Sequence, residues 1–167
     1  MEEWLEGEVV KNIKWTKNLA SLKIKAKINN HQAGQFTRIG LKVNDDFITR
    51  SYSYASAPKD EMLEIIYVNI PNGKLSPILH KLEIGDKVSV MQQAIGYFTL
   101  DEIPDGENLW LLATGTALGV FLAILKTSIP WKRFKKVILI HSVRYAEELI
   151  YQDLIAEMKQ RYPDQFI

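Results

Sequence analysis

The sequence predicts an α+β protein of two domains, an N-terminal antiparallel β-barrel followed by an incomplete parallel α/β domain. Residues 1–100 contain regularly spaced short runs in which apolar and polar residues mix at short period, as in a small barrel or sandwich. Residues 109–167 place their apolar runs in the order strand, helix, strand, helix, which is typical of a βαβ unit. The polar segment 101–108, which contains Pro104 and Gly106, predicts a linker between them.

The strands expected in the barrel alternate in polarity and are separated by turn signals. In one of them, Leu22 and Ile24 fall on one face and Lys23 on the other. The segment Asn44-Asp45-Asp46 and the dipeptide Ala57-Pro58 mark turns. The runs that predict strands are Glu8–Trp15, Ala20–Ala26, Gly34–Val43, Phe47–Tyr54, Leu63–Ile70 and Lys87–Met91.

One segment within the barrel region, Pro71–Leu82, breaks the strand pattern and predicts a short helix. Ser76 followed by Pro77 is typical of an N-cap and a first helical position. The preceding Gly73 and Lys74 would then offer backbone N–H groups and a cation at the positive helix end, which suits an anion. A plain capped helix crossing the open end of a barrel explains the same residues, and both interpretations stay open.

The second domain begins with apolar runs that predict parallel strands buried on both faces. A glycine-containing turn follows the first strand and opens a helix that runs to about Lys126. We expect the chain to be part of a longer protein, because an open sheet of two or three strands leaves apolar faces and edges uncovered. The expected elements are strands at Leu109–Ala113 and Val137–His141, the turn Thr114–Gly119, a helix at Ala146–Arg161 and the start of a third strand at Phe166-Ile167.

Composition narrows the classes of function. The 167 residues carry a net charge of +1, so nothing favours nucleic acid or a membrane surface, and the absence of cysteine excludes disulfides and thiolate metal sites. His31, His80 and His141 are too scattered to predict a metal site. The uncharged run Leu109–Leu125 predicts a strand, turn and helix rather than a membrane span. The acidic segment Met1–Glu6 lacks the layout of a secretory signal, so we expect a cytoplasmic protein.

The stretch R-S-Y-S-Y that begins at Arg50 carries the most chemistry. Alternation would place Arg50, Tyr52 and Tyr54 on one side of a strand and Ser51 and Ser53 on the other. An arginine can clamp a diphosphate through two hydrogen bonds, and a tyrosine can stack on a flat ring. The pattern suits a flavin nucleotide. An ordinary half-buried strand is the alternative.

Three further features of the second domain suggest binding. The turn Thr114–Gly119 lacks the full G-x-G-x-x-G pattern, but it places a glycine where a backbone can approach a diphosphate. Arg144 follows the second predicted strand, where an arginine favours NADP over NAD, although a solvent-facing loop arginine is the alternative. The basic cluster Trp131–Lys136 predicts either a solvated surface or a docking patch for an acidic protein.

The order of these motifs resembles the ferredoxin–NADP reductase family, most closely its bacterial form that uses ferredoxin or flavodoxin. An R-x-Y-S strand is followed by a G-K-L-S loop, a T-G-T-A turn and then Arg144. The similarity covers the whole chain, including Trp4 and Ala33-Gly-Gln-Phe36. The resemblance implies FAD held mainly by the barrel, NADP(H) as the substrate of the second domain, and ferredoxin or flavodoxin as the partner.

The resemblance also implies a role for individual residues. Arg50 would bind the FAD diphosphate. Tyr52 would stack beneath the isoalloxazine and Ser53 would hydrogen-bond near its redox nitrogen, which makes these two the expected catalytic residues. Thr116 would lie where the nicotinamide enters. The full expected set of cofactor-binding residues is Arg50, Ser51, Tyr52, Ser53, Ile66, Tyr67, Val68, Lys74, Leu75, Ser76, Thr116, Val143 and Arg144.

The remaining members of that set have implied roles of three kinds. Ile66–Val68 would line the flavin, Lys74–Ser76 would hold the diphosphate, and Val143 and Arg144 would contact the adenosine and its 2′-phosphate.

The chain departs from the family pattern at two positions. It carries Val120 where a proline is usual, and it places the aromatic residue at Tyr67 instead of Ile66. The family's later NADP-binding arginines, Cys-Gly segment and C-terminal aromatic cover would lie beyond the last residue.

The function expected from this resemblance is electron transfer between NADPH and a one-electron carrier protein through FAD. Such chemistry needs close ring stacking rather than a pair of carboxylates. Two alternatives stay open. One is a reductase component of an oxygenase system, which shares the two-domain core. The other is a non-catalytic binding module whose basic surface holds an acidic partner.

Overall fold

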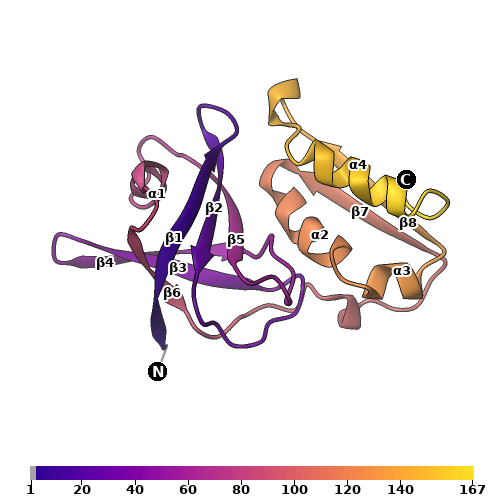
Figure 1. Cartoon of the computed structure of the whole chain (residues 1–167), viewed down its shortest axis with the longest axis horizontal. Helices are drawn as coiled ribbons and strands as arrows, with labels where there is room; N and C mark the ends of the chain where they lie inside the picture. The colour runs from indigo at the N-terminus through magenta and orange to yellow at the C-terminus, as the bar shows by residue number, and fades with distance from the viewer. Residues whose placement is uncertain (1–2) are drawn as a thin grey trace.

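The computed structural model describes residues 3–167 and arranges them as two units side by side (Figure 1). Met1 and Glu2, the start of the acidic segment noted above, lie outside the described residues. The first unit contains the strands β1 (Trp4–Lys14), β2 (Leu19–Lys25), β3 (Phe36–Val43), β4 (Asp46–Ser53), β5 (Leu63–Val68) and β6 (Lys87–Met91), with helix α1 (Ser76–Lys81) between β5 and β6.

The six strands form one antiparallel sheet in the order β4-β3-β6-β1-β2-β5. An isolated antiparallel bridge between Tyr54 and Ile65 joins the two outermost strands of that order. The sheet therefore curls round on itself, which pairs the strand edges that an open sheet would leave exposed. The predicted antiparallel barrel is confirmed.

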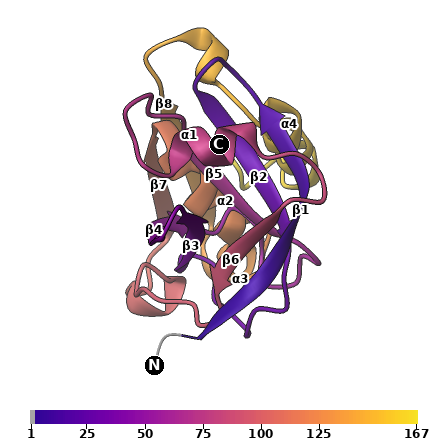
Figure 2. The ribbon, with the colours of Figure 1, turned by 90° about the vertical axis from the view of Figure 1, so that its left-hand side faces the viewer.

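The inside of the barrel is filled by the alternate residues of its strands. Leu22, Ile24, Ile39 and Ile65 have no exposed surface, whereas Lys25 on β2 faces solvent, as the period of two requires. Figure 2 shows α1 in front of the strands at one end of this unit.

Helix α1 is fastened to the barrel by side chains of β1, since Lys14 donates to the carbonyl oxygen of His80 and Asn12 makes two further bonds. Asn12 on β1 donates from Nδ2 to the carbonyl oxygens of Leu79 (2.8 Å) and Leu82 (2.9 Å), two acceptors at the end of the helix. Leu79 itself is fully buried in the barrel core. The predicted short helix is confirmed, and its position is set by a contact 67 residues away along the chain.

The second unit is a parallel pair of strands with helices. It comprises β7 (Asn108–Thr114), α2 (Leu118–Leu125), α3 (Ile129–Arg133), β8 (Lys136–Ser142) and α4 (Gln152–Arg161), with short 3₁₀ turns at Leu100–Glu102, Gly115–Ala117 and Ala146–Glu148. The strands pair in parallel, as predicted. A parallel bridge between Val137 and Phe166 marks the expected start of a third strand.

Two predictions for this unit are wrong. Burial on β7 alternates, with Trp110 60% and Leu112 64% exposed, so the strand is not buried on both faces. The reason is that α2 and α4 pack against the face that carries Leu111, and the described residues place no helix on the other. The expected helix from Ala146 is also interrupted, because Tyr151 adopts φ +59°, and α4 begins after it.

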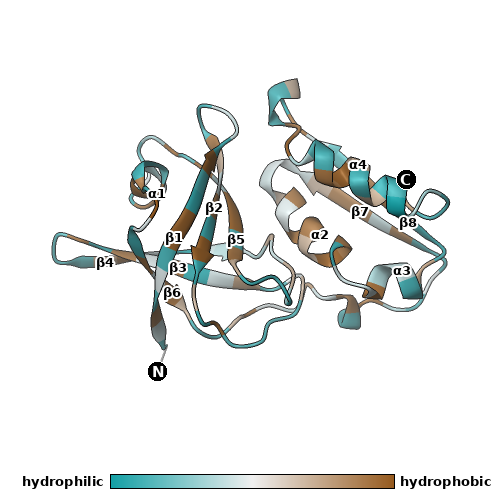
Figure 3. Ribbon diagram, viewed as in Figure 1, coloured by the Kyte–Doolittle hydropathy of each residue, from teal (hydrophilic) through white to brown (hydrophobic). Residues whose placement is uncertain are grey.

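The two units share one apolar core. Leu19, Ala55 and Ile66 of the barrel lie in the same buried cluster as Leu118 and Phe121 of the second unit. Helix α2 is apolar along most of its length (Figure 3), because it is buried between its own sheet and the barrel. The second unit therefore packs directly against the barrel and is not connected to it by the linker alone.

No helix in residues 3–167 is both long enough and apolar enough to cross a membrane.

Candidate functional site

The R-x-Y-S motif forms the end of β4, an outermost strand of the sheet order. Arg50, Ser51 and Ser53 are exposed, and Tyr52 is half-buried. Arg50 donates from Nη1 to the carbonyl oxygen of Thr49 at 2.7 Å, which uses one of its five donors and leaves a forked cation at the surface. The strand thus presents a cation and two hydroxyls to solvent.

The ring of Tyr52 is anchored in the barrel. It packs against the buried cluster that contains Tyr67 and Leu75. Burial raises the pKa of Tyr52 to about 12, against a smaller lowering by the charge of Arg50. The hydroxyl therefore stays neutral at physiological pH. A neutral, partly held ring suits stacking on a flat ligand.

The G-K-L-S loop is tied to the end of β5. Gly73 donates its backbone N–H to the carbonyl oxygen of Ile70 at 2.8 Å, and Ser76 Oγ accepts the backbone N–H of Ile70 at 3.0 Å. A Cβ on Gly73 would lie 3.0 Å from both acceptor oxygens, so a larger residue would crowd the turn. Lys74 is exposed, whereas Leu75 is buried in the barrel core.

The predicted N-cap role of Ser76 is wrong in detail. The helix begins at Ser76, its capping position is Leu75, and no side chain caps the helix end. The hydroxyl instead accepts the backbone N–H of Ile70, six residues earlier in the chain. Tyr52 and Leu75 both pack in the barrel core cluster, and a ligand shared by their two segments stays a prediction.

The three residues expected to line the flavin point in different directions. Ile66 is 7% exposed and contacts the second unit, Val68 is 45% exposed, and Tyr67 is 1% exposed inside the barrel. Tyr67 donates its hydroxyl to Asn12 Oδ1 at 2.9 Å. The side chain of Tyr67 is thus buried in the barrel core, so Tyr67 could contact a ligand only through its backbone.

The T-G-T turn lies at the carboxyl end of β7. Gly115 has φ +51°, a conformation that glycine adopts without strain, and a Cβ placed there would meet no atom within 4 Å. Thr116 in this turn is half-buried. His141 Nε2 lies 3.0 Å from the carbonyl oxygen of Gly115, so the side chain at the end of β8 steadies the turn. This contact gives His141 a structural role.

Val143 and Arg144 follow β8 at the same edge of the sheet. Thr114 and Ser142 are register partners, so the turn after β7 and the loop after β8 start side by side. Val143 is half-buried and Arg144 is exposed. The backbone N–H of Arg144 donates to Glu148 Oε2 at 3.2 Å, which shapes the loop. In open α/β sheets the carboxyl ends of the strands are where ligands bind.

Arg133 and Lys135, two cations of the basic cluster Trp131–Lys136, already bond to groups of the chain itself. Arg133 donates to Asp105 Oδ1 at 2.9 Å and to the carbonyl oxygens of Leu100 and Ile103, which pins the segment between the two units. Lys135 pairs with Glu107 at 2.5 Å. The predicted docking patch is therefore narrower than the motif, and Arg133 has a structural role.

The available groups fit the cofactor that the resemblance implies. Arg50 and Lys74 supply exposed cations for a diphosphate, Ser51 and Ser53 supply hydroxyls, and Tyr52 supplies a flat neutral ring. A site with this chemistry could hold FAD along β4 and the loop before α1.

Comparison with known proteins places the chain. Residues 6–98 match the family described as Oxidoreductase FAD-binding domain, and residues 111–167 match the one described as Oxidoreductase NAD-binding domain. The chain is 45% identical over 162 residues to the flavodoxin/ferredoxin–NADP reductase of Shigella flexneri and 44% identical to that of Escherichia coli K12. Each match covers 97% of this chain and 65% of the relative, so the chain spans slightly less than two thirds of their length.

A solved structure supports the same placement. The ferredoxin NADP+ reductase from Neisseria gonorrhoeae, which was crystallised with FAD and NADP, superimposes with a TM-score of 0.90 at 32% identity. The match covers 99% of this chain and 67% of that one. The chain therefore belongs to the ferredoxin–NADP reductase family, and its barrel is an FAD-binding domain of that family.

Proposed function

We propose that this chain is the cofactor-binding core of an enzyme that transfers electrons between NADPH and ferredoxin or flavodoxin. One observation carries the proposal: two binding segments meet on β5. Tyr54, at the end of the R-x-Y-S strand, bridges to Ile65, and Gly119, after the T-G-T turn, approaches Ile66. The expected FAD site and the expected nicotinamide entry thus flank the same strand.

The proposed division of the chain follows from this arrangement. Residues 1–100 form the FAD-binding barrel, 101–108 the linker and 109–167 the NADP-binding α/β part. The matched family ranges support these limits. The engagement of Arg133 with Asp105 supports a linker that is held in place and does not swing freely.

The residues have distinct tasks in this proposal. Arg50 and Lys74 neutralise and orient the diphosphate, Tyr52 supports the ring and Ser53 donates or accepts at its edge. Thr116 lies in the turn at which the nicotinamide enters. When bound, FAD supplies the chemistry, since it accepts two electrons with a hydride and releases them singly. The protein orients the rings and excludes water.

Reconstitution with FAD tests the first half of the proposal. The purified chain should turn yellow, with flavin absorbance that stays with the protein on gel filtration. Arg50→Gln and Lys74→Gln should each weaken FAD binding about tenfold or more, because each removes a charge-assisted contact of about 1.5–3 kcal/mol. Lys42→Gln, an equal loss of charge at the other end of the β3–β4 hairpin, is the control. A chain that stays colourless contradicts the proposal.

Selectivity for the nucleotide tests the second half. The chain should bind NADPH more tightly than NADH, and Arg144→Gln should remove most of that difference by removing the cation that faces the 2′-phosphate. Binding is measured by titration of the FAD-loaded chain. Equal affinities in the unmodified chain would remove Arg144 from the proposal.

The partner protein is the remaining part of the proposal. A ferredoxin or flavodoxin, the partners that appear in the names of the relatives, would dock on the basic surface that includes the exposed Lys132. Lys132→Glu should weaken binding of an acidic flavodoxin at low salt, and the difference should shrink as salt screens the charges. The same affinity before and after the change would place docking elsewhere.

A further inference from the structure

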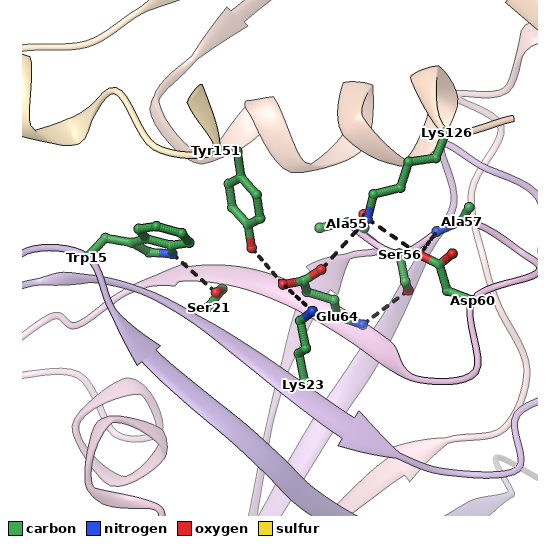
Figure 4. A network of polar contacts seen from close by, with 10 residues as sticks. All are labelled: Trp15, Ser21, Lys23, Ala55, Ser56, Ala57, Asp60, Glu64, Lys126 and Tyr151. Atoms are coloured by element: carbon green, nitrogen blue, oxygen red, sulfur yellow. Dashed lines mark hydrogen bonds and ion pairs between the residues drawn. The ribbon is translucent and has the colours of Figure 1, made fainter. Parts of the chain in front are cut away.

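A buried carboxylate lies at the boundary between the two units. The side chain of Glu64, on β5, is 5% exposed. Tyr151 donates its hydroxyl to Glu64 Oε1 at 2.7 Å, and Lys126 Nζ lies 3.8 Å from Oε2 (Figure 4). Lys126 directly follows α2 and Tyr151 directly precedes α4. One carboxylate of the barrel therefore holds both of these helices of the second unit.

Lys126 extends the network into the barrel. Its Nζ donates to the carbonyl oxygen of Ala55 at 3.1 Å and to Asp60 Oδ2 at 3.4 Å. Asp60 Oδ2 in turn accepts the backbone N–H of Ala57 at 2.9 Å. Figure 4 shows these groups gathered beneath α2. Ala55 is only two residues beyond Ser53, so the network is continuous with the end of the R-x-Y-S strand.

Tyr151, which bonds to Glu64, has an unusual backbone conformation. Its φ of +59° and ψ of +26° lie in the left-handed region, which a bulky side chain rarely adopts. Its ring packs 4.9 Å from that of Trp15, whose Nε1 donates to Ser21 Oγ at 3.1 Å. Burial and the nearby Glu64 charge raise the pKa of Tyr151, so its hydroxyl stays protonated and able to donate.

The opposite end of α2 is held by close packing. A Cβ on Gly119 would lie 3.2 Å from Ile66 Cδ1 and 3.3 Å from Ala55 Cβ, so the glycine allows the helix to approach the barrel closely. Gly119 and Lys126 fix the two ends of the same helix on the barrel. The T-G-T turn is continuous with that helix, and its placement depends on both contacts.

We propose that Glu64 is a positioning residue, which with Tyr151 and Lys126 fixes α2 and the Gly115–Ala117 turn relative to the FAD-binding barrel. The inference rests on the proposed function, since it assigns the network the task of aligning the nicotinamide entry with the flavin. Productive hydride transfer requires reacting atoms about 3–3.5 Å apart. A small rotation of α2 would move the Gly115–Ala117 turn relative to the barrel and remove that alignment.

The distance between the two units tests the inference directly. Because the chain contains no cysteine, Lys42→Cys on β3 and Lys159→Cys on α4 can carry a pair of spin labels for pulsed electron paramagnetic resonance. The labelled chain should give one narrow distance distribution. Tyr151→Phe should broaden it by removing the hydroxyl while keeping the ring against Trp15, and Lys126→Met should do the same from α2.

Substitutions at Glu64 separate positioning from simple stability. Glu64→Leu should broaden the distribution most, whereas Glu64→Gln, which still accepts from Tyr151, should restore part of the narrow distribution. Lys23→Met is the matched control. Lys23 lies 3.8 Å from Glu64, but the two residues pair on neighbouring strands of the same barrel, so its loss should leave the distribution unchanged.

The outcomes distinguish this inference from the proposed function. Unchanged distance distributions in Tyr151→Phe and Glu64→Leu, whatever their melting temperatures, would overturn the positioning role. FAD titration of the same variants should give an affinity close to that of the unmodified chain, because Glu64, Tyr151 and Lys126 are not among the residues proposed to hold FAD. If the unmodified chain does not bind FAD, the proposed function is wrong. The distance measurements would then still show whether Glu64 positions the second unit on the barrel.

Discussion

The barrel and the second unit differ in how each completes its sheet. The barrel pairs its outermost strands through the bridge between Tyr54 and Ile65 and fills its interior with its own side chains. The second unit has two paired strands, an exposed apolar face that includes Trp110 and Leu112, and a core completed by barrel residues. The barrel is therefore the scaffold, and the second unit depends on contact with the barrel to complete its folded core.

The largest expected effect comes from a tight approach within the scaffold. Gly34 has φ +106°, and a Cβ there would lie 1.8 Å from the carbonyl oxygen of Phe98. Gly34→Ala should destabilise the chain by more than about 4 kcal/mol, because backbone would have to move. Gly85 has φ +95° with no atom within 4 Å of an added Cβ, so Gly85→Ala should cost only about 1–3 kcal/mol of conformational strain. Urea denaturation measures both, and equal losses would contradict the role of the clash.

The dependence of the second unit on the barrel gives the next prediction. Leu122 on α2 and Leu22 on β2 are both fully buried, the first in the shared core and the second in the barrel core. Each change to alanine should cost about 2–5 kcal/mol. Leu122→Ala should also separate the unfolding of the two units, so that fluorescence of Trp131 changes at lower urea than that of Trp4. Coincident transitions in this variant would show that the shared core is not what couples them.

The contrast between the units also explains which features could be predicted from sequence. Alternation predicts barrel strands such as β2, because a strand with one face inside shows a period of two. The apolar run at β7 predicts a strand equally well, but it does not reveal what covers each face. Exposed Trp110 and buried Leu111 have the same apolar character in the sequence. The prediction of a strand at β7 is therefore confirmed, whereas the prediction that both of its faces are buried is wrong.

Long-range contacts account for the remaining differences. The periodicity from Ala146 onward favours one helix, yet Tyr151 turns out of it to meet Glu64, 87 residues earlier in the chain. Asn12 holds the end of α1 across a similar separation. No local pattern signals either contact, because each polar side chain is ordinary in its own segment. The candidate site residues were identifiable because each motif is local, whereas the residues that orient them are not.

Alkaline pH provides a third way to compare the two regions. Burial raises the pKa of Tyr67 and of Tyr52 to about 12, above the value of about 10 in an unfolded chain. Stability should be fully present below pH 10 and decline as pH rises from 10 towards 12, because the unfolded state loses protons first. Tyr67→Phe should flatten this decline while removing its hydrogen bond to Asn12 at all pH values. The measurement is the urea midpoint at pH 8, 9, 10 and 11.

An undiminished decline in Tyr67→Phe would assign the alkaline loss to other groups. Tyr145, which is 65% exposed in the second unit, supplies the control. Tyr145→Phe removes an exposed hydroxyl and should leave the pH profile of the chain unchanged.

The smallest expected effect on stability concerns the uncovered face of the second unit. Trp110→Thr and Leu112→Thr replace side chains that are 60% and 64% exposed on β7, and threonine suits a strand. Each should change the free energy of unfolding by about 0.5 kcal/mol or less. Both should lower self-association at high concentration, measured by light scattering, because exposed apolar area favours contact between molecules. A loss above about 1 kcal/mol would show that this face is packed in solution and that the contrast with the barrel is smaller than the structure indicates.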